Sequence, residues 1–208
     1  MRIRTIASLN SGAVQTRTLA VIVLLVAAGG LLVVLLNRPG SKTPRAEVSI
    51  APEMSRTNLV LEMGRLRQQG STDPFSGLMV EHYADGTLRS RSAVSNGVLH
   101  GLSQGWYTNG QIQVSEQFKE GVSDGVRTKW YAGGAKQSEA SIAAGKLNGT
   151  FRRWHENGVV SEEAEFVADK PEGVSVSYFP SGYLKARVVM KDGKAVEQNS
   201  WKDGEKKE

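Results

Sequence analysis

The sequence predicts an all-β fold: an elongated single-layer antiparallel meander of stacked β-hairpin repeats, preceded by one transmembrane helix. Three observations lead to this prediction. Glycines and aromatic residues recur every 24 residues, a tight-turn sequence lies in the middle of each unit, and one uninterrupted apolar stretch precedes the repeats. With 23 glycines and only 6 prolines, the composition also suits a turn-rich β protein better than a disordered chain.

Four columns of residues share the 24-residue spacing. The turn glycines are Gly86, Gly110, Gly134, Gly158 and Gly182. A second glycine column contains Gly77, Gly101, Gly125, Gly149 and Gly173. One aromatic column contains His82, Trp106, Trp130, Trp154 and Tyr178. The aromatic column beside it contains Tyr83, Tyr107, Tyr131, His155 and Phe179. Because no insertion breaks these columns across five units, they define a repeat array.

Each unit is predicted to contain two strands and two turns. In the second unit, LSQGWY (102–107) forms a strand, Asn109-Gly110 reverses the chain, and QIQVSEQF (111–118) returns. Asn-Gly favours a type I′ turn, in which both central residues need positive φ. The short connections make sequential strands pair antiparallel. About 11 to 13 strands at ~4.8 Å spacing would give a ribbon roughly 50–60 Å long.

Side-chain alternation predicts one apolar and one wet face. Four return-strand residues, Leu88, Ile112, Val160 and Leu184, should share a face with Val94, Phe118, Ile142, Phe166 and Met190. The two aromatic columns should point to opposite sides. We interpret Trp106, Trp130, Trp154 and Tyr178 as a structural aromatic column that holds the sheet. The candidate partner-binding face is the other column: Tyr83, Tyr107, Tyr131, His155 and Phe179.

The stretch GWYTNGQIQVSEQFKEGVSDG (105–125) resembles the shorter bacterial variant of the MORN (membrane occupation and recognition nexus) repeat. The shared features are an aromatic pair, x-Asn-Gly, a β return strand and Lys-x-Gly-x-x-x-Gly. Many such proteins are grouped as the YwqK-type family of antitoxins. The resemblance covers about residues 75–204 and implies an elongated sheet of stacked hairpins. The chain departs from it at three places: His155 takes a Tyr position, Asp169 takes a position where other units have Gly, and Val196-Glu197 stand where a Gly is expected.

The segment LAVIVLLVAAGGLLVVLL (19–36) is 18 residues long and has no polar side chain. As a helix it would span roughly 27 Å, close to the ~30 Å hydrocarbon core of a bilayer. A cleavable signal peptide is the alternative, but its apolar region is usually shorter, about 7–15 residues. The short N-terminal tail suits a signal anchor that exports the rest of the chain. We therefore predict a single-pass protein of the plasma (inner) membrane whose C-terminal repeat domain is periplasmic.

These predictions divide the chain into five parts. They are a short basic tail (1–18), the transmembrane helix (19–36), a linker (37–56), the MORN-like repeat domain (57–204) and a short tail (205–208). The repeat domain contains five 24-residue units from about residue 77, with a degenerate first strand around Leu59 to Leu66 and a closing strand.

Charge and composition exclude several functional classes. The net charge is +5, but residues 1–45 hold 6 basic and no acidic side chains, so the rest has 20 of the 26 basic and all 21 acidic ones. The repeats therefore give no reason to expect nucleic-acid binding. With no cysteine there is no thiol nucleophile or thiolate metal site. We predict no catalytic, metal-binding or cofactor-binding residues, and His100, just before a turn glycine, is expected to be solvated.

The leading functional prediction is a non-enzymatic, membrane-anchored repeat scaffold that mediates protein–protein interaction. The partner protein is not identified by the sequence, and residues 19–36 supply the membrane contact. One alternative, implied by the YwqK label, is an antitoxin that neutralises a partner toxin. Another is a surface module that binds glycan or lipid headgroups through the row of Tyr83, Tyr107, Tyr131, His155 and Phe179.

Overall fold

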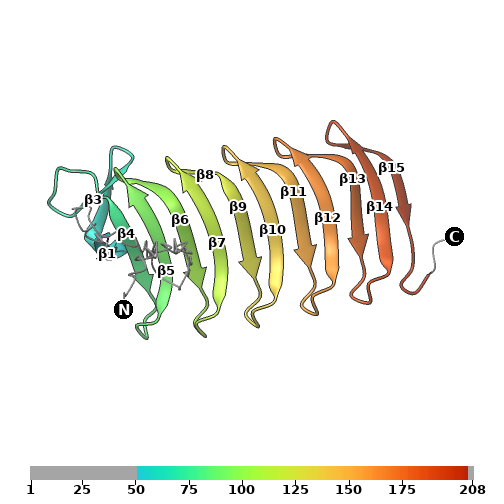
Figure 1. The fold of residues 1–208 in the computed structure, drawn as a ribbon, viewed down its shortest axis with the longest axis horizontal. Coiled ribbons are helices and arrows are strands. Elements are labelled where there is room, and N and C mark those ends of the chain that lie inside the picture. The colour runs from blue at the N-terminus through green and yellow to red at the C-terminus, as the bar shows by residue number, and fades with distance from the viewer. Residues whose placement is uncertain (1–50, 206–208) are drawn as a thin grey trace, which may run out of the picture. The chain divides into compact units, whose positions relative to one another are not determined.

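The computed structural model describes residues 51–205, which form a long β-sheet with strands side by side and turns along both edges (Figure 1). A short 3-10 helix, η1 (Arg56–Asn58), follows the first strand. The strands are β1 (Glu53–Ser55), β2 (Leu59–Glu62), β3 (Arg65–Gln68), β4 (Gly77–His82), β5 (Leu88–Ser95), β6 (Val98–Trp106), β7 (Ile112–Lys119), β8 (Val122–Ser123), β9 (Gly125–Trp130), β10 (Lys136–Ala143), β11 (Lys146–Trp154), β12 (Val160–Val167), β13 (Lys170–Tyr178), β14 (Leu184–Lys191) and β15 (Lys194–Ser200).

Within residues 51–205, 13 strands form one sheet in the order β1-β4-β5-β6-β7-β9-β10-β11-β12-β13-β14-β15, with β8 paired to β7. From β4 onward, strands that are neighbours in this order pair antiparallel, because each connection is short. The fold of the repeats is thus the all-β sheet of stacked hairpins that the 24-residue period predicts.

The helical part of the predicted fold class needs correction, because the residues that the structure describes form strands and one 3-10 helix only. No helix in residues 51–205 is long and apolar enough to cross a membrane. The transmembrane helix predicted over 19–36 lies outside the described residues. The predicted localisation, a single-pass protein of the inner membrane with periplasmic repeats, therefore has no support in this structure.

The start of the sheet also differs from a pure antiparallel meander. Strand β1 falls inside the predicted linker (37–56) and pairs parallel with β4, with Met54 opposite Met79. Strands β2 and β3, where a degenerate first strand was expected, form a separate two-stranded hairpin. The segment before the first unit is therefore strand β1 with the β2–β3 hairpin, and not another copy of the repeat.

The β2–β3 hairpin caps the first turn of the array. Leu59, Leu66, Phe75 and Val94 form a buried apolar cluster that joins the hairpin to the sheet. The Leu66 N–H donates to the Gly97 carbonyl over 2.8 Å, and the Phe75 N–H donates to the Leu66 carbonyl over 2.8 Å. The hairpin backbone thus lies directly against the Gly97 turn.

The two edges of the sheet use different turns. On the edge that includes Asn96-Gly97, two-residue loops have positive φ at both positions, 50° and 78° for this pair, as in a type I′ turn. On the other edge, the Gly110 N–H donates to the Tyr107 carbonyl over 2.9 Å, and Gly110 alone has positive φ, 80°. This is a three-residue loop ending in a left-handed glycine. The type I′ turn predicted for Asn109-Gly110 is therefore wrong.

A β-bulge beside each aromatic-edge turn changes which residues share a face. Trp106 lies opposite Ile112 while Gly105 lies opposite Val114, so residue 113 is extra. Ile112 therefore shares a face with Trp106 and not with Phe118, contrary to the face predicted by simple alternation. The same shift occurs beside His82, Trp154 and Tyr178.

We call the two surfaces of the sheet the core face and the Trp face. The core face carries Val94, Phe118, Ile142, Phe166 and Met190, each opposite a glycine of the preceding strand. The Trp face carries Leu102, Val126, Val174, Trp106, Trp130 and Trp154. On β6, β9, β11 and β13 these residues have even numbers, so they point to the same side of the sheet.

Candidate functional site

The predicted partner-binding column lies at the start of each aromatic-edge turn, and its tyrosines bind the following repeat. The Tyr83 hydroxyl donates to the Trp106 carbonyl over 2.7 Å, and the Tyr107 hydroxyl donates to the Trp130 carbonyl over 2.7 Å. Tyr131 makes the same bond to Trp154 over 2.8 Å. Each bond reaches 23 residues along the chain, so the two aromatic columns together clamp adjacent repeats.

The last two members of this column differ in how they meet the next repeat. His155 places Nε2 2.9 Å from the Tyr178 carbonyl. A carbonyl oxygen can only accept, so Nε2 carries the proton in this arrangement. Phe179 has no donor at the equivalent place, and the Lys185 ammonium lies 5.7 Å from its ring centroid. The hydrogen bond to the next repeat is therefore kept where His155 replaces Tyr, and it is lost where Phe179 replaces Tyr.

Asparagine side chains make a second clamp on the same edge. Asn109 Nδ2 donates to the Ala132 carbonyl over 2.9 Å, and Asn157 Nδ2 donates to the Pro180 carbonyl over 2.7 Å. Their Oδ1 atoms accept the N–H two residues later, which fixes the turn. The third unit has Gly133 here and lacks this clamp.

A gain of stability is expected where this clamp is missing. Gly133 has no atom within 4 Å of an added Cβ and no positive φ, so a side chain fits. Gly133→Asn should raise the free energy of unfolding by about 1–2 kcal/mol, combining a new hydrogen bond with a less flexible unfolded chain. Urea denaturation measures this. Gly133→Ala is the control, and an equal gain from both variants would contradict the clamp.

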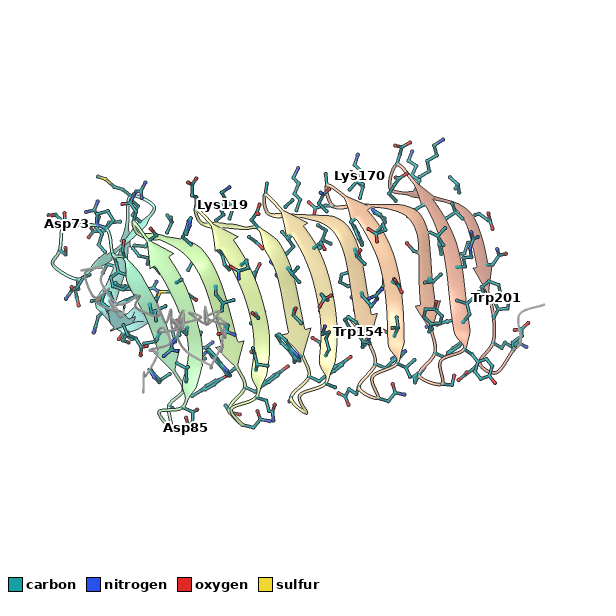
Figure 2. All side chains as sticks on the ribbon, viewed as in Figure 1. Asp73, Asp85, Lys119, Trp154, Lys170 and Trp201 are labelled. Atoms are coloured by element: carbon teal, nitrogen blue, oxygen red, sulfur yellow. The ribbon has the colours of Figure 1, made fainter. Side chains whose placement is uncertain are left out.

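Asp85 occupies the Asn position in the first unit and stabilises its own turn. It accepts from the Thr87 hydroxyl and from the Thr87 N–H, and these bonds lower the pKa of the Asp85 carboxyl. A lowered pKa means that the bonds contribute above the ordinary Asp range and are lost as pH falls through the folded-state value. Figure 2 shows Asp85 on the aromatic edge, opposite the edge that carries Lys119 and Lys170.

The structural aromatic column alternates with side chains of the return strands. Trp106 lies opposite Ile112, Trp130 opposite Lys136, and Trp154 opposite Val160. The Lys136 ammonium lies 5.2 Å from the Trp154 ring centroid, within cation–π range. Neighbouring indoles are thus separated by one strand, and they pack on aliphatic and ammonium groups. Figure 2 shows Trp154 near the aromatic edge.

Farther along the same face, three apolar side chains are exposed in a row. Leu102 is 42%, Val126 51% and Val174 47% exposed, and each occupies the same position in its repeat. Thr150 interrupts the row and is also exposed. Successive repeats place these side chains two strands apart, which corresponds to about 9.6 Å.

Between the exposed row and the tryptophans, the Trp face is charged but balanced. The Arg152 guanidinium pairs with Glu163, which raises the pKa of Arg152. Arg187 pairs with Glu197 over 3.0 Å. In the part of the chain that the structure describes, no group of three or more His, Asp or Glu residues is placed to hold a metal ion.

One set of contacts between neighbouring strands was missed by the sequence analysis. The residue before each second-column glycine accepts a hydrogen bond from the backbone N–H 20 residues later, in the type I′ turn. These acceptors are Ser76, His100, Asp124, Asn148 and Glu172. His100, expected to be only solvated, accepts from the Glu120 N–H through Nδ1 over 3.3 Å. The sequence did contain a signal for these contacts, because all five positions hold a side chain with an acceptor atom, although the residue types differ.

Two segments of the chain, residues 99–120 and 147–168, match the family model of the MORN repeat variant. They begin 48 residues apart, twice the repeat period, and each covers one outgoing and one return strand. No curated protein matches the chain. The match confirms the resemblance to MORN repeats at these two segments and gives no support to the YwqK-type family. MORN repeats are in general modules that bind proteins or membranes, and over these two segments the chain is similar to them.

Proposed function

We propose that the repeat domain is a non-enzymatic scaffold that binds an extended segment of a partner protein along its Trp face. The observation behind this proposal is the row of Leu102, Val126 and Val174, which keeps apolar side chains about half exposed at one position of the second, third and fifth repeats. Isolated exposed apolar residues are ordinary, but apolar residues that recur at one repeat position offer an extended partner several contacts in line.

The spacing of the row suits an extended chain. Repeats two strands apart are separated by about 9.6 Å, and three residues of an extended or polyproline-type segment span about 9–10 Å. A partner that crosses the strands would therefore place every third side chain on the row. Partly buried tryptophans on the same face add aromatic side chains, which are enriched at binding hot spots.

The column of Tyr83, Tyr107, Tyr131, His155 and Phe179 has a smaller part in this proposal. Three of its hydroxyls are already used between repeats. The Arg89 guanidinium lies 5.8 Å from the Tyr83 ring centroid, so that ring also has a partner within the chain. These residues contribute ring edges that border the surface.

The proposal predicts loss of partner binding without loss of fold. Leu102→Asp, Val126→Asp and Val174→Asp together should abolish crosslinking to the partner, because they place three charges in the apolar contact. The unfolding midpoint should change little, since exposed sites usually tolerate substitution within about 0.5 kcal/mol. Crosslinking of the full chain followed by mass spectrometry measures the binding.

A matched control uses apolar residues that are exposed elsewhere. Val122 is 45% and Val167 58% exposed, and both lie beside the type I′ turns and not on the row. Val122→Asp with Val167→Asp should leave the crosslinked partner unchanged. Equal losses from the row variant and this control would show that binding does not depend on the row.

A further inference from the structure

The Trp column begins with a smaller residue, and a depression lies beside it. His82 stands where later units have Trp106, Trp130 and Trp154. The depression has a volume of about 480 Å³. Its lining residues are Ser55, Arg56, Thr57, Glu81, His82 and Arg89. An imidazole is smaller than an indole, so the first unit leaves space that the ring would fill in later units.

The groups around this depression are mostly hydrogen-bond donors. Arg56 uses one N–H on the Leu59 carbonyl, over 2.8 Å, which leaves the other guanidinium N–H groups for a ligand. The Ser55 and Thr57 hydroxyls lie 2.8 Å apart. Glu81 is the one carboxylate among the lining residues, and it already accepts from the Ser90 hydroxyl over 3.0 Å.

The two arginines of this depression lack the ion pairs that other arginines make elsewhere on the sheet. Five arginines form ion pairs with glutamates: Arg91, Arg127, Arg152, Arg153 and Arg187. Among the described residues, neither Arg56 nor Arg89 has such a pair. Two guanidinium groups beside a concave surface favour an oxyanion, because the planar fork of donors matches carboxylate and phosphate oxygens.

We propose that this depression binds a small organic anion through a carboxylate or phosphate group held by Arg56 and Arg89. Of the paired Ser55 and Thr57 hydroxyls, one donates to the other and the other donates to the same anionic group, and His82 provides the space for it. The volume falls in the range of small-molecule sites. This site is independent of the proposed partner surface, since it uses none of Leu102, Val126 and Val174.

Titrations of the full chain with two anions test the site. Inorganic phosphate and acetate are added separately, and NMR follows the arginine Nε–Hε signals and the His82 ring. Saturable shifts with a dissociation constant on the order of 1 mM are expected for at least one anion. Saturation by phosphate alone assigns a phosphate ligand, and saturation by acetate alone assigns a carboxylate. No saturation by either up to about 50 mM would overturn the proposal.

The repeat itself supplies variants that preserve the fold. Arg89→Gln introduces the residue found at the equivalent positions 113 and 137, and it should weaken binding at least about tenfold. Lys185→Gln removes a charge at the same repeat position in the fifth unit and should leave binding unchanged. His82→Trp should abolish binding by filling the depression. If Arg89→Gln and Lys185→Gln weakened binding equally, the anion would be held by general electrostatic attraction and not by this site, which would overturn the proposal.

Discussion

Replacing Gly97 by alanine is expected to destabilise the protein by about 3 kcal/mol, because two costs combine. Gly97 has φ of 78°, a left-handed conformation that disfavours a Cβ. An added Cβ would also lie 2.7 Å from the Arg65 Cβ and 2.9 Å from the Leu66 carbonyl oxygen. The β2–β3 hairpin must therefore move away from the first turn. Urea denaturation measures the change, and hydrogen exchange at Leu66 shows whether the hairpin has separated.

Gly121 provides the matched control for this prediction. It occupies the same place in the next unit and has nearly the same φ, 83°. The nearest atom to an added Cβ is the Val98 Cβ at 3.7 Å, which is ordinary contact. Gly121→Ala should therefore cost only the backbone strain, about 1 kcal/mol. Equal effects at the two positions would contradict a tightly docked hairpin.

Phe151→Ala should have a comparably large effect in the middle of the sheet. Phe151 lies between Ala140 and Ala164 on neighbouring strands, and these alanines are only 6% and 4% exposed. Its ring also meets the Phe166 ring edge to face, with centroids 6.0 Å apart. Truncation should cost about 3 kcal/mol, since it removes ring contacts and uncovers both alanines.

The manner of unfolding should change as well. In repeat proteins each unit contacts only its neighbours, so a weak central unit can separate the two ends into independent transitions. Hydrogen exchange of Phe151→Ala should show faster exchange in β10 to β12 than in β5 to β7. Val126→Ala, at a side chain 51% exposed on the other face, is the control and should change stability by less than about 0.5 kcal/mol. A similar loss from both variants would contradict this account of the core.

The sequence was sufficient to predict the repeat period and the hairpin sheet. Columns such as Gly86 to Gly182 depend on backbone conformation, and all five of these glycines have φ between 80° and 89°. The turn type was not predictable from Asn109-Gly110, because the dipeptide also fits a three-residue loop in which only the glycine is left-handed. The hydrogen bonds from Tyr107 and Asn109 to the next repeat then favour this longer loop, and no local sequence pattern describes those bonds.

Two other features depended on structure beyond the local pattern. Alternation assigned Ile112 to the face of Phe118, but an extra residue in the strand reverses the assignment. The hydroxyl of Tyr107 was treated as a recognition group, whereas its acceptor is a backbone carbonyl 23 residues away. Every residue has a backbone carbonyl, so the residue type does not reveal which carbonyl accepts. A search for complementary side chains could therefore not identify that contact. The donor column itself was visible in the sequence.

The clamps also bear on how such a chain can change its length. Every clamp from a turn aromatic or asparagine begins in one unit and ends in the next, 23 residues later. A duplicated unit thus arrives with its own donor and its own acceptor, and a deleted unit removes one of each. Gain or loss of whole units leaves no unmatched group inside the array, so the number of repeats is free to drift during evolution while the capped end stays fixed. Length is then a property that selection can set in steps of one unit.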